Sequence, residues 1–163
     1  MITYIFSGFN PKEHFGKEVS IFFKEDMKNS KSIVFIPGNF DSPDKVKRYA
    51  LTDIEWFKEI DITLEDINIL DNNMQEDIMK EKLTKADIIF IMGGDTQKQN
   101  TFLEKYNLKE TIKTSKGIVI GISAGAINLG IDSLCSKDLD DGVEKTILYK
   151  IRIDKRANRR NPQ

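Results

Sequence analysis

The sequence contains one cysteine and one histidine in 163 residues, and this scarcity excludes several kinds of site. Cys135 cannot form a disulfide within the chain, which fits a reducing compartment. One histidine and one cysteine cannot supply the usual ligands of zinc, so we expect no metal site. The glycine-containing loops match neither the P-loop nor the dinucleotide fingerprint, and we expect no cofactor.

Long apolar segments and an excess of one charge are also missing. The apolar start, residues 2–6, is too short for a signal peptide or a membrane span, so we expect a cytoplasmic protein without a membrane partner. The 25 Lys and Arg residues nearly balance the 26 Asp and Glu residues, giving a net charge of −1. No field of the whole protein therefore attracts nucleic acid.

Residues 1–150 alternate between apolar, β-branched segments and segments with helical periodicity. The apolar segments predict strands at 2–6, 32–36, 67–70, 87–92 and 118–122. Asn10-Pro11 and Ser42-Pro43 are typical helix starts, with a cap residue before a proline at the first helical position. This alternation predicts a single three-layer α/β domain with a doubly wound, mainly parallel sheet of five or six strands.

The segment from Lys116 to Gly130, K-G-I-V-I-G-I-S-A-G-A-I-N-L-G, carries the strongest functional signal. A buried strand passes directly into a small-residue helix through Gly121-Ile122-Ser123-Ala124-Gly125, the pattern of a nucleophile elbow. Gly121 and Gly125 would avoid a Cβ clash between helix and strand, and the Ser123 hydroxyl would project at the carboxyl edge of the sheet. The alternative is a tight turn whose small residues only allow the helix to pack.

A second glycine-containing loop, Gly93-Gly94-Asp95-Thr96, follows the strand predicted before the elbow strand. Thr96 and Gln99 form a capping-box pattern, so a helix should begin directly after the glycine pair. The glycines would then expose backbone N–H groups at the carboxyl edge, where open α/β sheets bind their ligands. A plain helix cap with two permissive glycines is the alternative interpretation.

The G-I-S-A-G-A and G-G-D-T motifs together resemble the serine peptidase family of dipeptidase E (aspartyl dipeptidase) and cyanophycinase, over roughly residues 1–149. The resemblance implies a flavodoxin-like fold related to the class I glutamine amidotransferases. By position, Ser123 matches the family's nucleophile, and Ala124 with Gly93 or Gly94 matches the oxyanion hole. Asp138 matches the acidic member of the catalytic triad.

The sequence departs from the family because no histidine follows Ser123. The family places its catalytic histidine a few tens of residues beyond the nucleophile, and the resemblance ends near Lys150, so we expect a truncated relative. The sole histidine, His14, is expected in the first turn of the first helix. A 2-1-3-4-5 strand order would place its strand about 14 Å from the elbow strand, beyond the reach of a general base.

The C-terminal part offers weaker signals. Asp138, Asp140 and Asp141 lie in a polar loop at residues 132–142, and a further strand is expected at 143–149. Residues 151–163 form a basic tail that we expect to be disordered. The only tryptophan, Trp56, is expected to pack partly into the core.

Three functions follow from these observations. The first is a peptidase for small aspartyl peptides, weak or inactive without its histidine unless a partner subunit in a homo-oligomer supplies the base. The second is a non-catalytic relative that binds a small anion or a peptide. The third is an interaction module using the basic tail, although nucleic acid is the less favoured partner.

Overall fold

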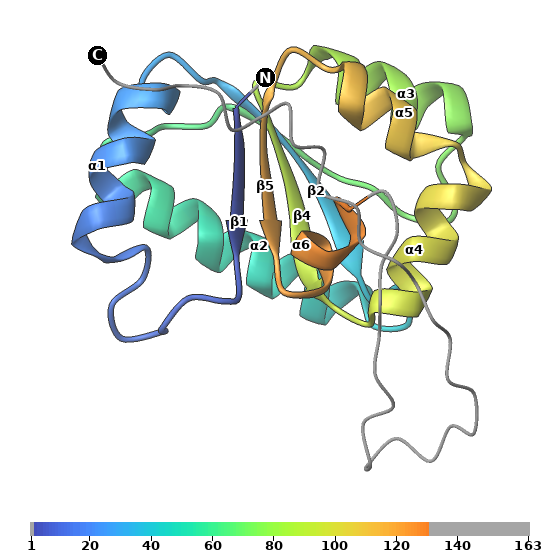
Figure 1. Cartoon of the computed structure of the whole chain (residues 1–163), viewed down its shortest axis with the longest axis horizontal. Coiled ribbons are helices and arrows are strands. Elements are labelled where there is room, and N and C mark those ends of the chain that lie inside the picture. Colours follow the sequence, from blue (N-terminus) through green and yellow to red (C-terminus); the bar gives the residue numbers. More distant parts are fainter. Residues whose placement is uncertain (1, 131–163) are drawn as a thin grey trace.

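The computed structural model describes residues 2–130, which form an α/β fold (Figure 1). Within these residues the strands are β1 (Thr3–Phe6), β2 (Ser32–Gly38), β3 (Asp66–Ile69), β4 (Ile88–Gly94) and β5 (Ile118–Ile122). The helices are α1 (Gly16–Met27), α2 (Pro43–Glu59), α3 (Glu76–Lys85), α4 (Thr96–Lys105), α5 (Leu108–Thr114) and α6 (Ala124–Asn128). All five predicted strands are confirmed, whereas α5 had not been predicted.

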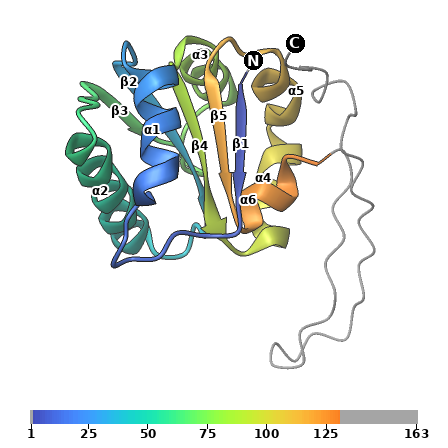
Figure 2. The same cartoon turned by 60° about the vertical axis from the view of Figure 1, so that its left-hand side comes forward.

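The sheet lies between two helical layers, with α1 and α2 on one face and α3, α4, α5 and α6 on the other (Figures 1 and 2). Successive side chains of the central strands point to opposite faces of the sheet, so each strand contributes to the apolar core beneath both helical layers. In β2, Phe35 belongs to the core beneath α1 and α2, whereas Val34 and Ile36 belong to the core beneath α3, α4 and α5. This burial on both faces explains why the strands have continuous apolar sequences.

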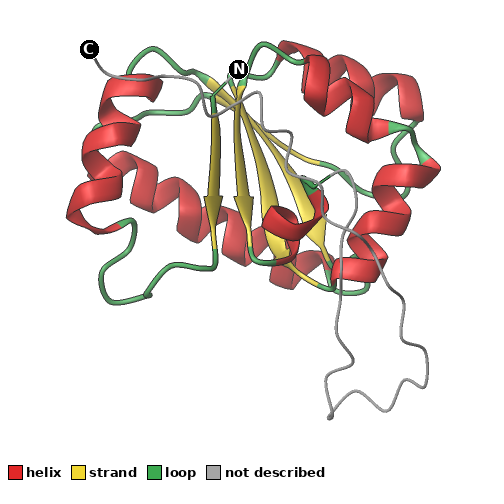
Figure 3. Cartoon of the chain, viewed as in Figure 1, coloured by secondary structure: helices red, strands yellow, loops and turns green. Residues whose placement is uncertain are grey.

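All strand pairs are parallel, in the order β1-β5-β4-β2-β3, so every strand ends at the same edge (Figure 3). If β2, β3, β4 and β5 are numbered 1 to 4, their order across the sheet is 2-1-3-4, which is the start of the flavodoxin-like order. The strand β1 takes the next position, beside β5. The predicted fold class is confirmed. The simple 2-1-3-4-5 order was wrong, because β1 pairs directly with β5, with Phe6 opposite Ile122. The 14 Å separation inferred from that order is therefore wrong as well.

The first helix starts later than its sequence pattern suggested. Asn10 does cap, but it caps a turn: its side chain accepts a hydrogen bond from the Lys12 N–H at 3.0 Å. His14 and Gly16 have φ values of 53° and 70°, which a right-handed helix does not allow. The regular helix therefore cannot include His14, which belongs to the preceding turn, and α1 starts at Gly16, whose own φ is still positive.

The short helix α6 lies almost in contact with the strand backbone. A Cβ atom on Gly125 would lie 2.1 Å from the carbonyl oxygen of Ile91 in β4. A Cβ atom on Gly121 would lie 3.0 Å from the Cα atom of Ala126. The packing role predicted for these two glycines is therefore confirmed.

A buried polar network holds α6 against α4. Gln99 donates a hydrogen bond to the carbonyl of Met92 at 2.8 Å, and its side-chain oxygen accepts one from Asn128 at 2.9 Å. The predicted pairing of Thr96 with Gln99 in a capping box was thus wrong. The cap of α4 is Asp95, whose side chain accepts a hydrogen bond from the Lys98 N–H at 2.9 Å. Gln99 can be completely buried because its side-chain amide forms hydrogen bonds with backbone and amide groups where β4 and α6 meet.

The packing of α6 predicts a large effect of Gly125→Ala. The added methyl group meets backbone rather than a movable side chain, so we expect a loss of at least about 2 kcal/mol in the free energy of unfolding, measured with urea. Gly8→Ala is the matched control, since a Cβ atom there would have no neighbour within 4 Å. Equal stabilities of the two variants would contradict the described packing.

Candidate active site

Ser123 occupies the junction between β5 and α6 with φ 50° and ψ −111°, a backbone conformation unusual for a residue other than glycine. Its N–H donates to the carbonyl of Phe6 at 2.9 Å, and the residue is exposed at the carboxyl edge of the sheet. The predicted direct turn from strand to helix at Ser123 is therefore confirmed, and its backbone is strained. Such strain costs about 1 to 3 kcal/mol and typically marks a functional position.

The glycine pair after β4 lies beside this turn. A Cβ atom on Gly93 would be 3.5 Å from the Cβ atom of Ser123, so the two residues are in direct contact distance. Gly94 has φ 139° and packs against the backbone of Gly38. Of the five predicted site residues, the fold thus gathers Ser123, Ala124, Gly93 and Gly94 at one edge, while Asp138 lies outside the described residues.

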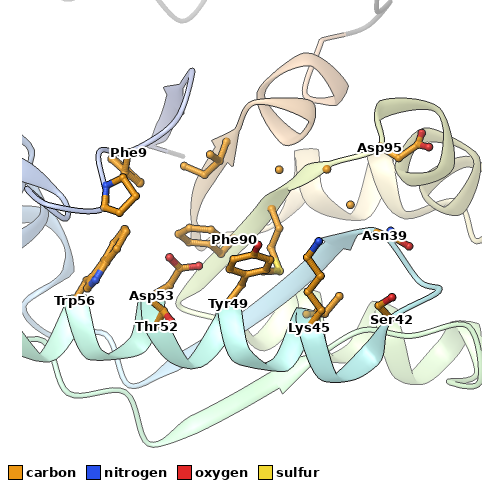
Figure 4. A pocket seen from close by; sticks show the side chains of 17 residues that line it. Phe9, Asn39, Ser42, Lys45, Tyr49, Thr52, Asp53, Trp56, Phe90 and Asp95 are labelled. Carbon is orange, nitrogen blue, oxygen red and sulfur yellow. The ribbon is translucent and has the colours of Figure 1, made fainter. Parts of the chain in front are cut away.

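A cavity of about 560 Å³ opens at this edge, between α2 and the loop after β1 (Figure 4). One wall is formed by the N-cap of α2 and one stripe along this helix, with Ser42, Lys45, Val46, Tyr49, Thr52, Asp53 and Trp56. The remaining lining comes from the loops and strand ends, with Phe9, Pro11, Gly38, Asn39, Phe90, Met92, Gly93, Gly94, Asp95 and Ile122. Because Gly93 and Ile122 adjoin Ser123, the cavity lies next to the candidate nucleophile.

Asp53 is a site residue that the sequence reasoning missed. It lies half-buried on the cavity side of α2, and burial raises the pKa of its carboxyl group from 3.8 to about 7. Within residues 2–130 it makes no hydrogen bond or ion pair. The signal was its spacing: Asp53 follows Val46 and Ala50 along the core-facing stripe of α2, where a carboxylate is unexpected.

Trp56 closes the end of the cavity near Phe9. Its ring centroid lies 6.3 Å from that of Phe9 and 5.6 Å from that of Phe15, and the residue is half-buried. The expected partial core packing is confirmed, and the same side chain also lines the cavity. Tyr49, which also lines the cavity, is 56% exposed.

His14 stacks on the outer face of Trp56, with 4.9 Å between ring centroids. Its Nδ1 atom lies 2.5 Å from a carboxylate oxygen of Glu59. The expected place of His14 in the first turn of the helix was wrong, because it lies in the turn before α1, where its exposed side chain has two partners. Both known contacts direct the imidazole toward α2 rather than toward α6.

The described residues give no sign of a metal site or a membrane span. Among residues 2–130, no group of three or more His, Cys, Asp and Glu side chains could hold a metal ion. No helix in this part of the chain is long and apolar enough to cross a membrane. Cys135, the loop at 132–142, the strand expected at 143–149 and the basic tail lie outside the described residues.

The raised pKa of Asp53 predicts that the free energy of unfolding decreases as the pH rises. An acid with a folded pKa of about 7 binds more protons when folded, so stability falls between about pH 4 and pH 7. At 1.36 kcal/mol per pKa unit, Asp53→Asn should be more stable than the wild type by up to about 4 kcal/mol at pH 8. At pH 4 the two should be similar. Parallel stability curves from urea unfolding across this range would contradict the assignment.

Comparisons with known proteins agree with this fold. A solved peptidase from an acI-B1 Actinobacterium has a TM-score of 0.58 and 17% identity, covering 82% of this chain and 58% of the other. A protein from Listeria monocytogenes EGD-e, described as a candidate peptidase E, has a TM-score of 0.55 and 23% identity, covering 77% and 59%. The chain therefore spans less than two thirds of either structure.

No curated protein matches the sequence. The family model of peptidase family S51 matches residues 4–149, which include all of β1 except Thr3, the strands β2 to β5, the Gly93-Gly94 loop and the Ser123 turn. The chain therefore belongs to peptidase family S51.

Proposed function

We propose that the chain carries the nucleophile half of a serine peptidase site for small aspartyl peptides. Ser123 attacks the peptide carbonyl, and the N–H groups of Ala124 and of the Gly93-Gly94 loop stabilise the oxyanion. The observation that carries this proposal is the exposed Ser123 in a left-handed conformation beside Gly93. A turn with a purely structural role would have no need to hold a serine under this strain.

The proposed site lacks its general base. A serine hydroxyl is a weak nucleophile until a neighbouring base accepts its proton, and His14 is the only histidine of the sequence. The Glu59 carboxylate on its Nδ1 atom would suit a catalytic histidine, but stacking on Trp56 holds the imidazole toward α2 rather than toward α6 and argues against that role. We therefore propose that any base comes from a second subunit, with Asp138 as the acidic residue of the completed triad, and that the isolated chain is a poor peptidase.

A non-catalytic relative that binds a small peptide or anion is the second candidate. The cavity favours it, because a space of about 560 Å³ falls within the usual range for ligand sites. Lys45 and Asp53 on its α2 wall provide both signs of charge. Binding without turnover of N-terminal aspartyl dipeptides would distinguish this candidate from the first.

A fluorophosphonate probe, which labels activated serines, tests the state of Ser123. Without a base the hydroxyl keeps an ordinary alcohol's reactivity, so we expect essentially no labelling by mass spectrometry. Ser123→Ala should likewise change dipeptide turnover little, because an incomplete triad leaves only about 10³ to 10⁴ of acceleration over water.

Rapid stoichiometric labelling at Ser123 would contradict this prediction and show that a base is present. The same experiment with His14→Ala would identify His14 as that base if labelling disappeared. A rise in labelling with protein concentration would indicate that a second subunit supplies the base, and its loss in His14→Ala would then identify the second subunit's own copy of this histidine.

A further inference from the structure

The cavity places a carboxylate among aromatic rings. Figure 4 shows Asp53 between Tyr49 and Trp56 on the cavity side of α2, with Phe9 and Phe90 across from this helix. Among the described residues no cation pairs with this carboxylate. Ionising a half-buried carboxylate that has no partner costs stability, so a structural role alone does not explain it.

Aromatic faces and a carboxylate are the two groups that proteins use to bind organic ammonium ions. The ring faces attract the cation and its carbon substituents, and the carboxylate accepts its N–H hydrogens. We propose that Asp53, with Phe9, Tyr49 and Trp56 around it, is a subsite for the ammonium group of the bound ligand. The further assignment to the α-ammonium of a small peptide rests on the proposed function.

Lys45 lines the same wall of the cavity and carries the charge opposite to that of an ionised Asp53. This pair of charges matches the ammonium and carboxylate groups of a small peptide. Lys45 lies on α2 beside Tyr49, with its Nζ atom 6.0 Å from the ring centroid. Lys45 and Asp53 are eight residues apart, which corresponds to about 12 Å along a helix. An extended dipeptide of roughly 7 Å, with a hydrogen bond of about 3 Å at each end, covers a similar distance. Asp53 would hold the ammonium group and Lys45 a carboxylate.

The subsite makes affinity depend on pH. The ligand binds best when Asp53 is ionised, and its pKa of about 7 places that change between pH 6 and pH 8. The other ionisable groups on the cavity wall are Lys45, Tyr49 and Asp95. His14 stacks on Trp56 and contacts Glu59, so His14→Gln is the control variant for this side chain.

The single tryptophan makes the test direct, because Trp56 lines the subsite. The dipeptide Asp-Leu and its N-acetylated form are titrated against Trp56 fluorescence in the Ser123→Ala background, which removes any turnover that depends on the Ser123 hydroxyl. Asp53→Asn removes the charge with little change of shape. Asp44→Asn, an exposed site on the first turn of α2, is the control for charge at a distance.

We expect Asp-Leu to bind several-fold more tightly at pH 7.5 than at pH 5.5, also in the His14→Gln variant. N-acetylation and Asp53→Asn should each weaken binding roughly ten- to hundred-fold at pH 7.5, and their combination little more than either alone. Asp44→Asn should bind like its parent.

Equal affinity of Asp53→Asn and its parent would overturn the subsite, as would equal affinity for the acetylated dipeptide or no binding of Asp-Leu at any pH. Thermal unfolding of each variant excludes misfolding as the cause of lost binding. Because the titration uses Ser123→Ala, its result is independent of whether Ser123 can be labelled, and the two proposals can fail separately.

Discussion

The close approach of α6 to the sheet is the constraint on which the candidate site depends. Gly125 packs so near the carbonyl of Ile91 that a single methyl group would not fit. The chain must therefore reverse direction between the end of β5 and this contact, and Ser123 takes the left-handed conformation that the reversal requires. The buried pair of Gln99 and Asn128 then fixes α6 to α4 and to the end of β4.

The parallel sheet determines what else lies near Ser123. With β5 between β1 and β4, the loops leaving three neighbouring strands meet at one edge. The loop after β1 contributes Phe9 to the cavity, and the loop after β4 contributes Gly93 and Gly94. The helix α2 completes the wall with Asp53, whose ionisation in the folded chain costs stability. A nucleophile candidate and a binding cavity thus share a single edge of the sheet.

Local patterns in the sequence predicted the strands, the elbow and its packing glycines, because these features depend on neighbouring residues. The place of β1 beside β5 could not be predicted in this way, since strand order is decided by packing between distant segments. The same limit applies to Asp53, whose surroundings come from β4 and the loop after β1. The delayed start of α1 depended on the φ angle of His14, for which the capping pattern of Asn10 gave no indication.

Chemical rescue tests most directly whether Ser123 is a positioned nucleophile that lacks only its base. Added imidazole can accept the proton of the hydroxyl, and release of p-nitrophenol from an activated ester reports the acylation. The account predicts that the rate rises with imidazole concentration more steeply in the wild type than in Ser123→Ala, beyond the reaction of imidazole with the ester in solution. Identical imidazole dependence in the two proteins would contradict it.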